Sequence, residues 1–306
     1  MVQLPRYVLI TPARNEAQFI DLTLKSVVAQ TLKPIRWLIA SDGSTDGTDD
    51  IVRRYLAEHP WIELVRLPER RERHFSGKVQ AFNAGYERVR DLDYEVIGNL
   101  DGDISFDPEY FAFLMDKLAA DPLLGVVGTP FVENGIQAYD YRYVNIEHVS
   151  GACQMFRRQC FEQIGGYVPA KRGGIDYMAV TAARMRGWKT RTFTEKLCHH
   201  QRKIGTADRS VLLARMMFGE KDYALGNHPL WELFRAFYQM TKRPAVVGGL
   251  AILFGYAWAW LRQIEKSVPS EIQAFVRQEQ MQRLKLILSA TASAGKPISN
   301  RPTRRA

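Results

Sequence analysis

Short apolar runs alternate with amphipathic segments through the first two hundred residues of the chain. Runs with the length of buried strands lie at 7–10, 36–40, 62–67 and 95–100. Between them, segments at 16–30, around 51–56 and at 77–90 place apolar residues on one face at helical spacing. Strands and helices that alternate at this pitch are typical of a doubly wound sheet. We therefore predict an α/β fold with a mostly parallel sheet flanked by helices.

The pattern changes in the second half of the chain. After 125–130 the alternation loosens, and it then predicts a helix around 155–164 and another near 176–186 that Gly187 would end. From about residue 210 the chain becomes helical, aromatic and basic. We predict three parts: a sheet domain at 1–210, a helical region at 211–290, and a tail at 291–306 that lacks apolar periodicity and is expected to be disordered.

Cysteine content and the first residues bear on the cellular compartment. The chain has three cysteines, Cys153, Cys160 and Cys198, with no CxxC pair. An odd number without close pairs argues against a disulfide framework and against a zinc ribbon. The N-terminus shows no basic region followed by a long apolar stretch, as a signal peptide would. These features predict a cytoplasmic protein.

Charge is distributed unevenly along the chain. Residues 1–200 contain 25 basic and 26 acidic residues, whereas residues 201–306 contain 17 basic and 7 acidic ones, so the net charge of +9 comes from the last third. A basic surface suits nucleic acid, anionic lipid or water, and charge alone does not choose among them. No nucleic-acid recognition motif accompanies it, and we predict no nucleic-acid partner.

Polar motifs follow three predicted strands: TPARNE at 11–16, SDGSTDGT at 41–48 and NLDGD at 99–103. In open α/β sheets, ligands bind outside the carboxyl ends of the strands. Asp42 in the second motif offers an acceptor for a donor group of a base or ribose, which suits a nucleotide. The alternative for this stretch is an ordinary turn in which Thr45 or Asp46 caps the next helix.

The third motif places Asp101 and Asp103 on either side of a glycine. Like charges at this spacing repel, so the pair favours a cation between them. Oxygen ligands prefer a hard divalent ion, Mg²⁺ or Mn²⁺, which would also neutralise a diphosphate. A solvated surface turn is the alternative, but the position at the end of an apolar strand favours a metal site.

Five motifs together resemble family 2 glycosyltransferases, whose fold is called GT-A. They are ITPARNE, SDGSTDGT, GKVQAFNAG, GNLDGDISFDPEYF and FRRQCFEQIGGY, in the family's order over about residues 5–200. The resemblance implies that Asp42 contacts the nucleotide base and that Asp101 and Asp103 hold the metal and the donor. It also implies a catalytic base in the segment after GGY, which falls on Asp176.

Further site residues are assigned beside these. We place Pro12, Arg14 and Glu16 of the first motif in the nucleotide site, and Lys78 against a phosphate, with a solvated lysine as its alternative. We rank His200 above His199 as a site residue. Three roles stay open for it: a third metal ligand, a contact to the diphosphate, or a structural histidine. The alternative for Asp176 is an N-cap of the helix that it precedes.

The chain departs from the family pattern at three places. Ser41 stands where the family usually has a first aspartate, and Ile175 stands where a second carboxylate often precedes the base. The family's frequent QxxRW motif is absent, and CHHQRK at 198–203 lies near its expected position.

The resemblance implies an inverting, metal-dependent glycosyltransferase of the hexosyltransferase type. The donor would be a nucleotide sugar, and the acceptor a lipid-linked saccharide or polyprenyl phosphate in bacterial-type polysaccharide or glycolipid assembly. Two other hypotheses stay open. A nucleotidyltransferase would require a basic, glycine-rich phosphate loop, which TPARNE is not. A non-catalytic sugar-nucleotide binder acting as a membrane scaffold would fit the departures at Ser41 and Ile175.

An uncharged run at 245–261 lies inside the basic C-terminal third. As a helix it would extend roughly 25 Å, short of a hydrocarbon core of about 30 Å. It can cross the membrane, lie in the interface or cover a protein core. Its tryptophans and the surrounding basic charge favour attachment to the inner face of the cell membrane.

Overall fold

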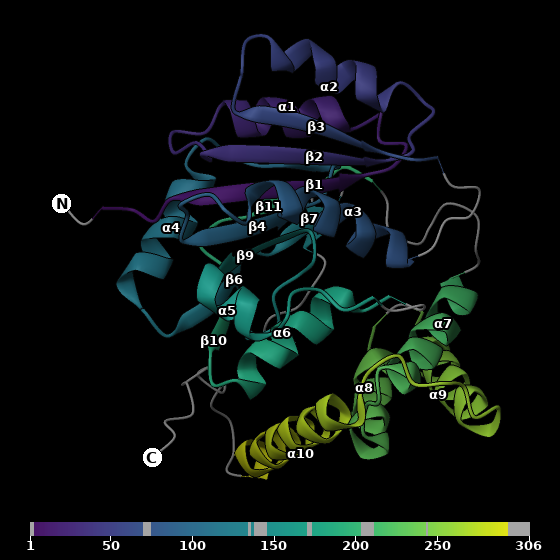
Figure 1. Cartoon of the computed structure of the whole chain (residues 1–306). Coiled ribbons are helices and arrows are strands. Elements are labelled where there is room, and N and C mark those ends of the chain that lie inside the picture. Colours follow the sequence, from purple (N-terminus) through teal and green to yellow (C-terminus); the bar gives the residue numbers. More distant parts are fainter. Residues whose placement is uncertain are drawn as a thin grey trace. The chain divides into compact units, whose positions relative to one another are not determined.

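The apolar runs of the sequence become the strands of one central sheet. In the computed structural model, which describes residues 3–69, 75–133, 136–137, 146–169, 173–202, 211–242 and 244–292, seven strands lie in the order β10-β6-β9-β4-β1-β2-β3 (Figure 1). Their bounds are β1 Tyr7–Ala13, β2 Arg36–Asp42, β3 Ile62–Leu67, β4 Val96–Leu100, β6 Leu124–Gly128, β9 Cys153–Arg157 and β10 Lys189–Thr192. Neighbours pair in parallel except at β9, which is antiparallel to β4 and β6. The predicted α/β fold with a mostly parallel sheet is confirmed.

The expected helix at 155–164 is wrong in its first residues. They belong to β9, and the helix α5 (Arg158–Gln163) begins only after it. Met155 and Phe156 are both fully buried, and successive side chains of a strand point to opposite faces. A strand buried on both faces reads as a continuous apolar run, which periodicity does not separate from a short buried helix.

Helices cover both faces of the sheet. On one face α1 (Ile20–Val28), α2 (Thr48–Leu56) and α4 (Tyr110–Ala120) share a core with side chains such as Leu9 and Trp37. On the other face, Phe82 of α3 (Phe75–Val89) and Phe161 of α5 pack with Phe156 of β9, with ring centroids 5.5 to 5.7 Å apart. The helix α6 (Ile175–Met185) contacts β6 and β10. The sheet is therefore packed on both faces, and these contacts position the ends of its strands.

A small second sheet extends the end of the main one. Its strands β5 (Ile104–Ser105), β11 (Cys198–His200), β7 (Phe131–Glu133) and β8 (Ile136–Gln137) lie in that order. The antiparallel pairing of β11 with β5 sets His200 opposite Ile104. Residues nearly one hundred positions apart in the chain are thereby brought beside the motif at 99–103.

The chain divides into two units, Met1–Ala207 and Asp208–Ala306. The second unit contains α7 (Val211–Ala224), α8 (Pro229–Met240), α9 (Val247–Leu261) and α10 (Ser270–Ala292). The predicted boundary at residue 210 lies outside the described residues, as does the predicted tail from 293 onward; residues 291 and 292 are the end of α10. Among the described segments, no helix is both long and apolar enough to cross a membrane.

Candidate functional site

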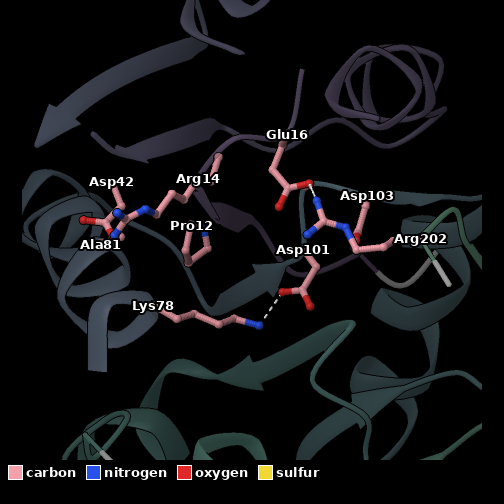
Figure 2. A pocket seen from close by; sticks show the side chains of 11 residues that line it. Pro12, Arg14, Glu16, Asp42, Lys78, Ala81, Asp101, Asp103 and Arg202 are labelled. Carbon is pink, nitrogen blue, oxygen red and sulfur yellow. Dashed lines mark hydrogen bonds and ion pairs between the residues drawn. The ribbon is translucent and has the colours of Figure 1, made fainter. Parts of the chain in front are cut away.

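Three neighbouring strands bring the polar motifs together. Because β1 lies between β2 and β4 and is parallel to both, the three carboxyl ends meet at one edge of the sheet. A cavity of about 520 Å³ opens there (Figure 2). Its lining includes seven of the predicted site residues: Pro12, Arg14, Glu16, Asp42, Lys78, Asp101 and Asp103. Ala13, Ala81, Gly102 and Arg202 complete the lining.

Asp42 ends β2 at one side of the cavity. Its carboxylate faces the Arg14 guanidinium, with Nη1 3.5 Å from Oδ2, and both side chains are largely buried (Figure 2). The turn that follows needs Gly43, because its φ is +63° and a Cβ there would lie 2.6 Å from the Glu69 backbone. Ser41, which departs from the family pattern, is buried, and its hydroxyl donates to Ser44 Oγ at 3.0 Å. The serine therefore supports the turn and leaves Asp42 at the cavity.

Asp101 follows β4 and pairs with Lys78, which reaches across from α3 (Figure 2). Burial raises the pKa of Asp101; the Lys78 ammonium opposes this effect and the Asp103 charge adds to it. Burial alone would lower the pKa of Lys78, but Asp101 first, and then Asp176 and Asp103, raise it above its usual value. Lys78 is thus a charged ammonium group among three carboxylates.

Asp103 lies at the other side of Asp101, beside a second cation. Arg202 forms an ion pair with Glu16, and its Nε lies 3.5 Å from Asp103 Oδ2. The guanidinium thereby holds two carboxylates of the cavity, one from the segment after β1 and one from the segment after β4 (Figure 2). Sequence reasoning did not assign Arg202, although its position directly after the CHHQ segment was a usable signal.

His200 contacts Asp103 from β11 without lining the cavity. Its Nδ1 contacts the carbonyl oxygen of Arg202, and because a carbonyl only accepts, Nδ1 carries the proton there. The other ring nitrogen, Nε2, lies 3.6 Å from Asp103 Oδ2. The imidazole and the carboxylate thus face each other, and a cation bound by Asp103 would lie beside Nε2. His199, by contrast, is exposed.

Asp176 lies in the first turn of α6, close enough for its charge to raise the pKa of Lys78. The N-cap of α6 is Gly174, and Asp176 Oδ2 accepts a hydrogen bond from the Gly151 amide at 3.2 Å. The expected alternative, a helix N-cap, is therefore wrong for this residue. Buried Gln154 supports the turn, since its Nε2 donates to the backbone oxygens of Val149 and Asp176.

The donor set for a divalent ion is chemically suitable but incomplete in its geometry. Asp101 and Asp103 supply oxygens and His200 Nε2 a nitrogen, and cationic side chains already balance the carboxylates. In the part of the chain that the structure describes, no group of three or more acidic, histidine or cysteine side chains is arranged to hold a metal ion. Metal binding by these residues stays a prediction.

A scan against protein families matches residues 8–165 to the model described as "Glycosyl transferase family 2". Among curated proteins, the poly-beta-1,6-N-acetyl-D-glucosamine synthase of Staphylococcus epidermidis is 23% identical over 247 residues, covering 74% of this chain and 55% of the relative. The synthase of the same description from Staphylococcus aureus (strain COL) is 30% identical over 121 residues, covering 39% of this chain and 27% of the relative. This chain thus spans about half the length of the first of these relatives, and less of the second.

Many solved structures share the fold, among them the two that follow. The mannosyltransferase PcManGT from Pyrobaculum calidifontis, solved with GDP-Man and Mn²⁺, has a TM-score of 0.57 at 21% identity and covers 95% of this chain and 84% of its own. TarS 1–349 from S. aureus, solved with UDP-GlcNAc, has a TM-score of 0.54 at 14% identity, covering 89% and 78%. At these identities the likeness concerns the fold alone.

Proposed function

The chain belongs to glycosyl transferase family 2, and on that premise we propose that it transfers a hexose-type sugar from a nucleotide sugar to an acceptor. The observation that carries the proposal is the meeting, in one cavity, of Asp42, the Asp101–Asp103 pair, and the cations Lys78 and Arg202. A nucleotide sugar presents a base, a diphosphate and a sugar in that order. In the cavity, Asp42 offers a hydrogen-bond acceptor for the base, and Lys78 and Arg202 offer cations for the diphosphate.

The donor would lie with its nucleoside near Asp42 and Arg14 and its diphosphate near Lys78. Pro12 and Ala81 supply apolar lining beside the nucleoside end. Glu16 acts indirectly, by holding Arg202 through their ion pair. The structural neighbours carry a guanine nucleotide sugar in one case and a uracil nucleotide sugar in the other, which supports the donor class without selecting a base.

We assign Mg²⁺ or Mn²⁺ to Asp101, Asp103 and His200. When bound, such an ion neutralises charge on the diphosphate leaving group. A related fold was solved with Mn²⁺, which supports the assignment. Arg202, which contacts Asp103, would then turn to the diphosphate oxygens.

Asp176 is the proposed general base. An acceptor hydroxyl attacks the anomeric carbon on the side opposite the departing diphosphate, and Asp176 takes the hydroxyl proton as the new bond forms. Attack from the opposite side inverts the configuration at that carbon. With Ile175 in the preceding position, one carboxylate carries this role.

For the acceptor we propose a lipid-linked saccharide or polyprenyl phosphate at the inner face of the cell membrane. The basic, aromatic C-terminal third supports a membrane setting. The curated relatives are described as polysaccharide synthases, which supports a role in polysaccharide or glycolipid assembly.

The test is a screen of GDP-sugars and UDP-sugars for release of nucleoside diphosphate, with Mn²⁺ or EDTA and with or without lipid acceptors. We expect one donor to be consumed rapidly only when metal and a lipid acceptor are both present. Donor binding without turnover on any acceptor would instead favour the non-catalytic sugar-nucleotide binder. Release of pyrophosphate from nucleoside triphosphate and sugar phosphate would favour a nucleotidyltransferase.

A further inference from the structure

In helix α9, most buried side chains are small and many large apolar side chains are exposed, the reverse of what is usual in a helix that packs in water. Its buried positions are mostly small: Gly248, Gly249, Gly255 and Ala259, with Ile252. Its large apolar side chains, by contrast, are exposed, with Phe254 at 54% and Leu261 at 67%. Val247, Leu250 and Trp258 continue the same exposed stripe at spacings of three and four residues.

The buried glycines let neighbouring backbones approach closely. A Cβ at Gly255 would lie 2.0 Å from the Met216 carbonyl oxygen of α7, and one at Gly219 of α7 would lie 2.0 Å from the Ile252 carbonyl oxygen. On another side of α9, a Cβ at Gly249 would lie 2.4 Å from the Ala236 carbonyl oxygen of α8. Glycine is required at these contacts, so α9 is fixed with its large side chains facing away from α7 and α8.

A helix that packs in water buries its large apolar side chains and exposes polar ones. In a lipid environment the helices meet through small residues, and the large apolar side chains face the acyl chains. α9 follows the second pattern, apart from the buried Ile252. The same is true of one face of α8, where Leu230, Leu233 and Phe237 are exposed at helical spacing.

The C-terminal end of the α9 stripe suits a membrane interface. The Trp258 ring stacks on Phe254 with centroids 6.1 Å apart, and the Arg262 guanidinium lies 4.5 Å from the Trp258 ring centre. Tryptophan and arginine at the border of an apolar surface are typical of the headgroup level. Residues 208–306 also contain 15 basic and 7 acidic residues, which complements an anionic surface.

We infer that α9 and the exposed face of α8 form a lipid-binding surface that inserts into one leaflet of an anionic bilayer. The 15 residues of α9 extend roughly 22 Å at 1.5 Å per residue, so the helix lies within the leaflet and does not cross the core of about 30 Å. The inference gives the proposed membrane setting a defined surface. Its test measures lipid binding and not sugar transfer, so either proposal can fail alone.

The experiment is flotation of the full chain with vesicles of phosphatidylcholine alone or with phosphatidylglycerol, at low and high salt. Phe254→Glu puts a charge at the centre of the stripe and should lower the partition coefficient at least about tenfold. The matched control is Leu123→Glu, which should leave binding to vesicles unchanged. Leu123 lies in the first unit, and its exposed fraction of 57% is close to the 54% of Phe254. Circular dichroism of each variant checks that the helices remain.

A second measurement needs no variant. Lipids brominated along their acyl chains should quench the fluorescence of the exposed tryptophans of α9 when the wild-type chain is mixed with vesicles. Failure of the folded wild-type chain to float at low salt would overturn the inference. In that case a monomer in solution would mean that the stripe is covered by the chain itself, and a dimer would mean that a second copy covers it. Equal loss of binding in both glutamate variants would overturn it as well.

Discussion

Asp176 keeps its place through a close contact with Gly151, where a side chain would be crowded. A Cβ at Gly151 would lie 3.0 Å from Asp176 Oδ2, so the absence of a side chain there lets the amide donate to the carboxylate. If Asp176 is the general base, Asp176→Asn should lower turnover by about a hundredfold or more, the usual contribution of such a base. The dissociation constant of the donor should barely change. Steady-state kinetics with calorimetric donor binding measure both quantities.

The matched control for that variant is Asp116→Asn, at an exposed aspartate of α4. Turnover should be unaffected there. If Asp176→Asn weakens donor binding strongly while turnover at saturating donor stays normal, Asp176 binds the donor and another group takes the proton.

If Asp103 binds a metal ion, Arg202 competes with that ion for the carboxylate. Its guanidinium occupies the space beside that carboxylate and also holds Glu16. Arg202→Ala should therefore tighten Mn²⁺ binding to the donor-free protein, because a competing cation is removed. The same variant should weaken binding of the nucleotide sugar, because a diphosphate contact is lost. Weaker Mn²⁺ binding in the variant, measured by calorimetry, would show that Arg202 supports the metal site.

At the scale of elements, the site residues that were predicted share one feature. Asp42 and Asp101 lie at the carboxyl ends of apolar strands, and in a parallel sheet the ends of neighbouring strands lie at the same edge. Arg202 follows β11, whose place depends on pairing with β5, nearly one hundred residues earlier in the chain. No local pattern in the sequence encodes that pairing. For the same reason, the local pattern predicts a helix where β9 lies, because it does not encode the pairing of β9 with β4 and β6.

A buried carboxyl group makes the second unit sensitive to pH. Burial first, and then the charge of Asp222, raise the pKa of Glu232 of α8 to about 8, from 4.5 in the unfolded chain. Between pH 4.5 and about pH 8, Glu232 is protonated in the folded protein and ionised in the unfolded chain. The contribution of the protonated Glu232 to stability is therefore complete below pH 4.5 and is lost as the pH rises toward 8.

Replacing Glu232 with glutamine should remove this dependence. Calorimetric unfolding of wild-type protein should show a transition that shifts to lower temperature from pH 5 to pH 8, and Glu232→Gln should reduce that shift. The control is Glu265→Gln, at an exposed position. An equal pH shift in wild type and Glu232→Gln would mean that Glu232 is ionised in the folded protein throughout.

In the whole molecule, we propose separate tasks for the two units. The first unit is an α/β sheet with the proposed donor site at its strand ends, and the second is a set of helices with an apolar outer face. The alternation of apolar runs with amphipathic segments, together with the motifs at the strand ends, is enough to predict the first unit. For the second unit the sequence is ambiguous, because the uncharged run at 245–261 suits a buried, interfacial or spanning helix. The contacts at Gly219, Gly249 and Gly255 decide which face of α9 is buried.

In the proposed mechanism the carboxylates after β4 bind a metal ion and thereby the donor. The most direct measurement is the rate of Mn²⁺-dependent nucleoside diphosphate release by wild type, Asp101→Ala, Asp103→Ala and the exposed control Asp116→Ala. We predict that both site variants lose activity by at least about a hundredfold, since each removes a metal ligand, while the control retains the wild-type rate. Wild-type turnover in Asp101→Ala or Asp103→Ala, or full activity of the wild type in EDTA, would contradict the account.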